Sequence, residues 1–215
     1  MKLFALLLAA MVTSAHAIAP GFINTFSTGL DDWQKGQVNP TYLSVPTTGG
    51  PAGTGDAYME SVADGVGSFG RLTVFNSAEW STDFIADGVT SVKMDLLPAA
   101  VPLEIRLALR LGGNIGYISS SAFTLAPGGT WQSASFSLAA ADMTAVGAPG
   151  SYNDVLSAAN FQFRILNAAS TSNVRGDAVS ATLGIDNIEA IPEPATWGLL
   201  VLGAGVCAAA ARRRR

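Results

Sequence analysis

The sequence predicts an all-β fold, an antiparallel β-sandwich, on three observations. Apolar and polar residues alternate in several stretches, turn sequences separate these stretches, and only one short stretch is typical of a helix. Many short strands without helical crossovers favour two antiparallel sheets packed face to face.

The stretch 103–111 (LEIRLALRL) shows the alternation most clearly. Successive side chains of a strand point to opposite sides, so one side of this strand is apolar and the other is charged. The apolar side holds Leu103, Ile105, Leu107, Leu109 and Leu111, and the other holds Glu104, Arg106 and Arg110. The same period predicts strands within 89–97, 160–166 and 178–185.

Turn-rich sequences at 46–55, 111–114 and 126–129 break the chain between these strands. The stretch 151–159 (SYNDVLSAA) predicts the one helix, with Asn153 or Asp154 as its N-cap.

Residues 1–17 have the pattern of a secretory signal peptide, with a basic Lys2, an apolar run and the small residues Ala15 and Ala17 before the expected cut. A permanent N-terminal anchor is the alternative, but it needs roughly 20 apolar residues and this run has ten. The Sec translocon and signal peptidase are therefore expected partners, and the mature protein is expected to begin near Ile18.

The C-terminus predicts a short transmembrane helix over residues 195–211, which has 17 residues and would span roughly 25 Å. Four arginines, Arg212, Arg213, Arg214 and Arg215, follow it and would remain on the cytoplasmic side. The body of the protein is therefore expected outside the cytoplasm. A plain single-span membrane anchor fits the same length and charge.

The triplet Pro192, Glu193 and Pro194 directly precedes this helix. Triplet, helix and basic end together resemble the PEP-CTERM sorting signal, also called the ice-binding protein C-terminal domain. The resemblance implies recognition and removal of the tail by exosortase. It also implies a Gram-negative host, an inner-membrane intermediate and delivery to the cell surface or extracellular matrix. Residues 192–215 are thus predicted to be a sorting signal and residues 18–191 a single ectodomain.

The composition of the ectodomain excludes several kinds of chemistry. It has more than twice as many acidic as basic residues, which argues against nucleic acid as a partner. The only cysteine, Cys207, and the only histidine, His16, lie in the two terminal segments. The ectodomain therefore has no disulfide, no thiol nucleophile, no histidine base and no zinc site built from Cys or His.

Three segments of the ectodomain resemble galactose-binding-like and carbohydrate-binding jelly-roll modules: 26–33 (FSTGLDDW), 129–138 (GTWQSASFSL) and 183–188 (LGIDNI). The resemblance implies a jelly-roll fold and a sugar ligand. Many such modules hold a structural calcium with an acidic residue after the first phenylalanine, where this chain has Ser27. Asp186 with Asn24 could still bind calcium, but Asp186 is more simply explained by hydrogen bonds to neighbouring backbone, and no cofactor is expected.

Aromatic residues are the candidate sugar platforms. Trp33 and Trp131 lie at positions where the resemblance implies core packing. Trp80 lies in a turn-like stretch and Tyr117 follows a glycine-rich one, so both are expected to be exposed and are the predicted ligand-binding residues.

Paired carboxylates are the remaining route to catalysis, as in glycoside hydrolases. The candidate pairs are Glu79 with Asp83, and Glu104 with Asp95 on a possible neighbouring strand. Charged residues on strands and in turns are usually solvated or turn-forming, so no catalytic residue and no enzymatic activity are predicted.

Three functions follow from these observations. The first is an exported surface protein that binds or scaffolds exopolysaccharide, as in a biofilm matrix. The alternatives are a secreted glycoside-active enzyme and a plain membrane-anchored surface protein. Ice binding would need a regular threonine ladder, which the sequence lacks.

Overall fold

The computed structural model describes residues 18, 21–36, 41–98, 100–158 and 160–192. Thirteen strands are assigned in this part of the chain: β1 (Ile23–Asn24), β2 (Trp33–Gln34), β3 (Leu43–Ser44), β4 (Met59–Asp64), β5 (Thr73–Asn76), β6 (Val89–Leu97), β7 (Leu103–Gly112), β8 (Ile115–Ser119), β9 (Phe123–Leu125), β10 (Gln132–Ser137), β11 (Met143–Val146), β12 (Gln162–Asn167) and β13 (Ser180–Pro192). The helices are α1 (Tyr152–Ser157) and two short 3₁₀ turns, η1 (Gly67–Phe69) and η2 (Ala140–Asp142).

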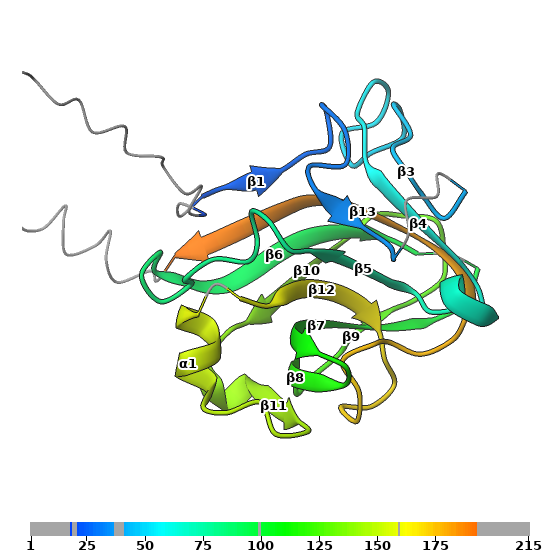
Figure 1. The fold of residues 1–215 in the computed structure, drawn as a ribbon. Coiled ribbons are helices and arrows are strands. Elements are labelled where there is room, and N and C mark those ends of the chain that lie inside the picture. The colour runs from blue at the N-terminus through cyan, green and yellow to red at the C-terminus, as the bar shows by residue number, and fades with distance from the viewer. Residues whose placement is uncertain (1–17, 19–20, 37–40, 99, 159, 193–215) are drawn as a thin grey trace, which may run out of the picture.

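The strands form two antiparallel sheets that stack face to face (Figure 1). Sheet A has the order β10-β6-β13-β4-β3, with β1 also paired to β13. Sheet B has the order β11-β8-β7-β12-β5-β2, with β9 also paired to β7. The predicted all-β sandwich is confirmed.

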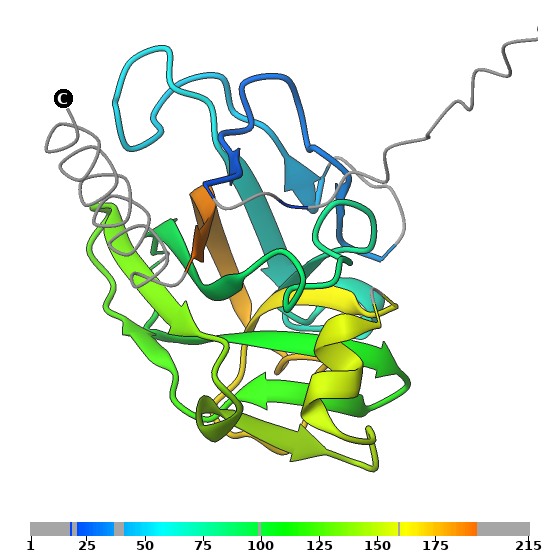
Figure 2. The same cartoon turned by 90° about the vertical axis from the view of Figure 1, so that its left-hand side faces the viewer.

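The predicted strands are confirmed as β6, β7, β12 and β13. The predicted helix is confirmed as α1, which lies at one end of the sandwich in both views (Figures 1 and 2). Its predicted cap is wrong: Ser151 is the N-cap, and its hydroxyl accepts a hydrogen bond from the amide of Asp154.

The main core lies between the sheets. Alternate residues of each long strand point inward, such as Leu107 and Leu109 of β7 and Phe163 and Ile165 of β12. Leu111, predicted on the same apolar side, is 40% exposed because it lies at the end of β7, where the register with β8 shifts. Burial of this apolar surface is the main favourable contribution to folding.

A second apolar cluster lies on the outer side of sheet B, formed by Ala108, Ile118, Val146, Leu166, Ala168 and Val174. Residues 168–179, between β12 and β13, fold back over part of this face and bring Val174 onto it. As a result Arg106, predicted on a solvated side, is buried and donates hydrogen bonds to the carbonyls of Ala168, Ser119 and Ser120.

Candidate functional site

Trp80 is wholly buried, so the prediction of an exposed ring is wrong. Its ring stacks on Phe163 at a centroid distance of 4.8 Å, and its indole N–H donates to Asn24 Oδ1 at 2.6 Å. Trp33, predicted in the core, is confirmed there and donates to the same oxygen at 3.1 Å. Asn24 thus supplies the acceptor that two buried indoles need.

Tyr117 is also buried, with 8% of its surface exposed, which overturns its predicted exposure. Its ring packs edge-to-face with Tyr152 at 4.9 Å, and its hydroxyl donates to the carbonyl of Gly150 at 2.7 Å. Tyr117 therefore links β8 to the segment that precedes α1, and neither predicted ligand-binding residue offers a free ring to a sugar.

Trp131, expected in the core, lies instead on the outer side of sheet A and is partly exposed. It packs edge-to-face on Tyr58 at 5.3 Å, and its indole N–H donates to the carbonyl of Gly49 at 2.9 Å. Gly184 of β13 lies beneath both rings, where a Cβ atom would come within 3.2 Å of each. The ring therefore holds segment 46–57 against the sheet.

Asp186 lies beside this cover, opposite Asp95 in the β6–β13 register. It is 1% exposed, one carboxylate oxygen accepts the amide N–H of Asn187, and the other has no partner among the described residues. Burial, with smaller contributions from the carboxylates of Asp56 and Asp95 and against the opposing effect of the Asn187 amide, raises the pKa of Asp186 to about 7.

The calcium pair of Asn24 and Asp186, which the sequence left open as an alternative, does not fit this geometry. Asn24 Oδ1 already accepts from Trp33 and Trp80, and its amide donates to Asp31 and Glu79. Within the described residues no group of three or more acidic, His or Cys side chains is placed to hold a metal ion. Asp186 does accept a backbone hydrogen bond, as the simpler interpretation expects.

The candidate catalytic pairs have structural contacts instead. Glu104 lies on β7 of sheet B and Asp95 on β6 of sheet A, so the proposed pairing across neighbouring strands is wrong. Asp83 accepts the amides of Ile85 and Ala86 in a turn, and Glu79 accepts from Asn24.

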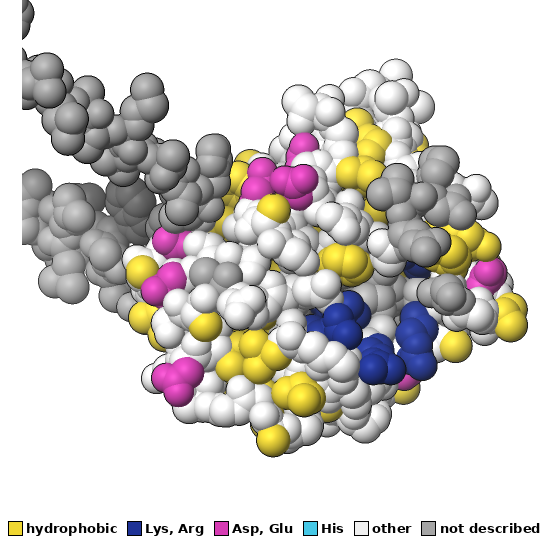
Figure 3. Space-filling model, in the orientation of Figure 1, with side chains coloured by type: hydrophobic (Ala, Val, Ile, Leu, Met, Phe, Trp, Pro, Cys, Tyr) yellow, Lys and Arg dark blue, Asp and Glu magenta, His cyan; other side chains and the backbone are white. Residues whose placement is uncertain are grey.

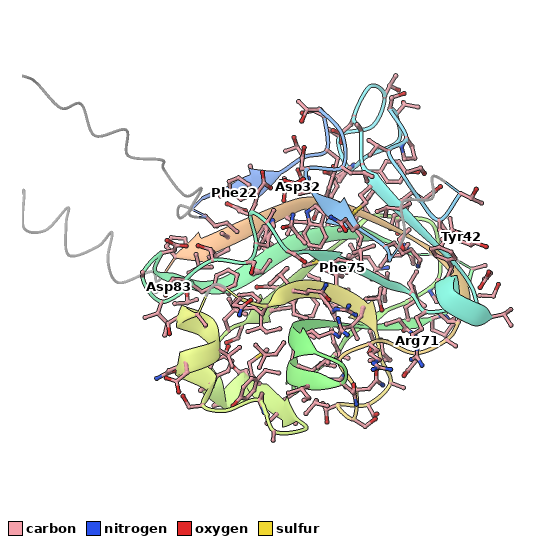
Figure 4. All side chains as sticks on the ribbon, in the orientation of Figure 1. Phe22, Asp32, Tyr42, Arg71, Phe75 and Asp83 are labelled. Carbon is pink, nitrogen blue, oxygen red and sulfur yellow. The ribbon has the colours of Figure 1, made fainter. Side chains whose placement is uncertain are left out.

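Four arginines on the outer side of sheet B and the buried Lys35, which follows the edge strand β2, gather around one hollow, a feature that sequence reasoning missed. They line a hollow of about 210 Å³ with Gly36, Thr73 and Phe75. We call them the basic cluster: Lys35, Arg71, Arg110, Arg164 and Arg175. Figure 3 shows dark blue side chains concentrated in one patch, and Figure 4 labels Phe75 and Arg71 on the same side of the molecule.

The strand register explains how the cluster forms. Arg110 of β7 is opposite Gln162 of β12, and Arg164 of β12 is opposite Phe75 of β5, all on the outer side. The Arg164 guanidinium lies 5.1 Å from the centre of the Phe75 ring, a cation–π contact. Arg71 precedes β5, and Arg175 comes from the segment that covers the neighbouring part of the face.

A second hollow of about 240 Å³ adjoins the first, because Arg110 lines both. Its other lining residues are mostly polar: Ser77, Ser81, Leu111, Asn160, Phe161 and Gln162. We call these two adjoining hollows the depression; of the two phenylalanines that line it, Phe75 is partly exposed and Phe161 is buried.

The comparisons with known proteins bear first on the C-terminus. The family model for the PEP-CTERM protein-sorting motif matches residues 190–215. The chain carries a PEP-CTERM sorting motif. This motif marks an exported, exosortase-processed surface protein, as the sequence predicted.

Only the first residue of the Pro-Glu-Pro triplet is described in the structure. Pro192 ends β13 and pairs with Val89, so the final strand of the sandwich runs directly into the sorting motif. Ala15, Ala17, Glu193, Pro194, the predicted transmembrane helix and Arg212 to Arg215 lie outside the described residues. In the part that is described, no helix is long and apolar enough to span a membrane.

The fold resembles solved carbohydrate-binding modules. The family 11 module of a Clostridium thermocellum cellulase is 11% identical, with a TM-score of 0.47, 81% of this chain covered and 96% of that one. The same module in complex with a β-1,3-1,4-mixed-linked tetrasaccharide gives 12% identity, a TM-score of 0.48, and coverage of 81% and 96%. An exo-β-agarase gives 14% identity and a TM-score of 0.46 over 76% of this chain and 22% of its own. A search of curated proteins finds no sequence match.

Proposed function

We propose that this chain is a cell-surface protein that binds extracellular polysaccharide, without cleaving it, through the depression on the outer side of sheet B. The single observation that carries the proposal is the depression itself. It consists of two hollows that share Arg110, and hydrogen-bonding side chains line it around one partly exposed aromatic ring, Phe75. Sugar sites combine these features, because a flat ring packs against the sugar and polar groups orient its hydroxyls.

The sorting motif supports an extracellular ligand, because it marks the protein for delivery to the surface. Export would use the Sec translocon and signal peptidase, and exosortase would act on an inner-membrane intermediate of a Gram-negative cell. Binding without cleavage fits the candidate catalytic carboxylates, because Asp95 and Glu104 lie on different sheets and Asp83 is engaged in a turn.

Affinity electrophoresis tests the proposal with polysaccharide extracted from the matrix of the producing cells. The protein is purified from cells that express the full chain and is run through gels with and without the polymer. Retardation by the polymer is expected. Ser77→Leu puts an apolar side chain into the second hollow. It should lower the affinity for the polymer about tenfold, which corresponds to the loss of one or two hydrogen bonds.

Ser133→Leu is the matched control, because Ser133 is exposed on β10 of sheet A and lines neither hollow. Equal mobility with and without polymer would contradict the proposed function. Release of reducing ends from the polymer over time would instead support the alternative of a glycoside-active enzyme.

A further inference from the structure

Charge is sorted between the two faces of this acidic protein. Residues 18–191 contain seven lysines and arginines. Five form the basic cluster, and Arg106 lies beside them on the outer side of β7. The seventh, Lys93, is exposed on sheet A. All five arginines of the ectodomain therefore lie on one face, which concentrates positive charge there in a molecule that is acidic overall.

Within the described residues, the hydrogen bonds of the basic cluster go to neutral acceptors. Lys35 donates to Ser61 Oγ at 3.2 Å and to the carbonyl of Arg71 at 2.9 Å. Arg110 and Arg164 both donate to the side-chain oxygen of Gln162, at 2.7 and 2.6 Å. Arg175 donates to the carbonyl of Gly113 at 3.0 Å. None of these bonds neutralises a positive charge.

The cluster also keeps like charges close together. Burial, together with the smaller effect of the charges of Arg110 and Arg175, lowers the pKa of Arg164 to about 9. Burial and the charge of Arg175 lower the pKa of Arg110 as well. These guanidinium groups remain charged at neutral pH. Their mutual repulsion is a cost that a bound anion would relieve.

The side chains at the rim have donors to offer. Arg71 and Arg175 are exposed, and each makes one guanidinium hydrogen bond to a carbonyl among the described residues, Arg71 to Gly176 and Arg175 to Gly113. A guanidinium has five N–H donors in a planar fork that matches a carboxylate or a sulfate. The depression thus has exposed forks at its rim and a half-buried ring, Phe75, within it.

We infer that the ligand of this depression is an anionic polysaccharide, whose acidic groups bind the basic cluster while a sugar ring packs on Phe75. This inference rests on the proposed function and specifies its ligand. The acidic group is a uronate carboxylate or a sulfate ester, since the same fork binds both. A polysaccharide is favoured over nucleic acid because the sorting motif delivers the protein to the surface and because only one aromatic ring lines the cluster.

A pair of polymers with the same backbone tests the inference. Polygalacturonate is compared with its carboxyl-reduced form, in which each uronate is a neutral galactose, and dextran sulfate is compared with dextran. Protein from cells expressing the full chain should bind an acidic polymer at least tenfold more tightly than its neutral counterpart, the value of one charge-assisted hydrogen bond. The pair that shows the difference identifies the acidic group.

Arg71→Gln with Arg175→Gln should lower the affinity for the acidic polymer about tenfold or more. Arg175→Lys should keep part of the affinity, because it retains the charge but loses the fork. Lys93→Gln, which removes one positive charge from sheet A, should bind as the unmodified protein does. Thermal melts of each variant separate a lost contact from a lost fold.

The outcomes separate the two proposals. Equal binding of acidic and neutral polymers, with no effect of the arginine substitutions, would overturn the anionic ligand and leave polysaccharide binding standing. Binding of none of these polymers, nor of the matrix polysaccharide, would overturn both. A single-stranded oligonucleotide that bound more tightly than every acidic polysaccharide would contradict the inference in favour of a nucleic-acid surface.

Discussion

The outer sides of sheets A and B both crowd charges of one sign, and they accommodate this crowding by different means. On sheet A, Asp95 and Asp186 are opposite each other in the β6–β13 register and Asp56 is near, yet Asp186 takes up a proton at a pKa of about 7. On sheet B, Arg110, Arg164 and Arg175 repel one another but keep their protons at neutral pH. A crowded acid can neutralise itself, whereas a crowded arginine needs an anion from outside.

The two sheets also differ in how far a chain segment covers their outer side. Segment 46–57 is held down on sheet A by Trp131, which donates to Gly49, and Asp186 is sealed beside it. On sheet B the segment 168–179 covers Arg106 and leaves the hollow beside it open. The closed face is therefore a structural feature, and the open face is the candidate binding surface.

The largest expected effect is a difference in the free energy of unfolding between a variant of Trp80, in the core, and one of Trp131, on the outer side of sheet A. Trp80→Ala should lower the free energy of unfolding by about 3–5 kcal/mol, because it leaves a cavity among Trp33, Phe84 and Phe163. Trp131→Ala should cost about half as much, because its ring is already partly exposed. Urea denaturation measures both. Equal losses would mean that Trp131 belongs to the core after all.

The next effect concerns the closed face, through Asp186→Asn. A carboxyl whose pKa is raised to about 7 in the folded state favours folding at low pH, and this contribution is lost as pH rises from about 4 to 7. The variant should therefore be more stable than the unmodified protein at pH 8, by more than about 1 kcal/mol, and similar to it near pH 4. Thermal melts across this range give the difference.

Chelation tests whether a calcium ion, rather than a proton, neutralises Asp186. With a proton as the neutralising species, addition of EDTA should leave the melting temperature unchanged. A fall of several degrees on chelation, restored by calcium, would contradict the protonated carboxyl and indicate a metal site.

A smaller effect concerns Lys35, which lines the first hollow but is only 5% exposed. Burial lowers the pKa of Lys35 to about 8, and the carboxylate of Asp64 opposes this shift only in part. Binding of an acidic polymer should therefore weaken a few-fold as pH rises from 7 to 9, because the depression loses one positive charge. Lys35→Met should bind more weakly at pH 7 and lose the part of this pH dependence that lies near pH 8, whereas Arg164, with a pKa of about 9, accounts for any change close to pH 9. An unmodified protein with flat affinity over this range would show that Lys35 does not contribute.

The sequence predicted the parts of the fold that local pattern determines. β6, β7, β12 and β13 were readable because alternation along each strand reflects one buried side. Strands of two residues, such as β1 and β2, carry no such pattern.

The candidate site was not readable because long-range pairing creates it. Arg71 donates a hydrogen bond to the carbonyl of Gly176, 105 residues away, and no local sequence pattern predicts that contact. The turn-like stretch around Trp80 predicted an exposed ring. The ring is buried because its indole N–H has an acceptor, Asn24, that lies 56 residues away in the sequence. The count of basic residues argued against nucleic acid as a partner, while the register of β7 and β12 placed Arg106, Arg110 and Arg164 on one side.

The salt dependence of binding tests the open, positively charged face most directly. Protein from cells that express the full chain is used, and its association constant for polygalacturonate is measured at several salt concentrations. Its logarithm should fall linearly with the logarithm of salt concentration, because binding releases condensed counterions from the polymer. The slope should be smaller by roughly two for the Arg71→Gln, Arg175→Gln variant, about one for each lost contact, and unchanged for Lys93→Gln. The same slope in all three proteins would contradict a polymer site at the basic cluster.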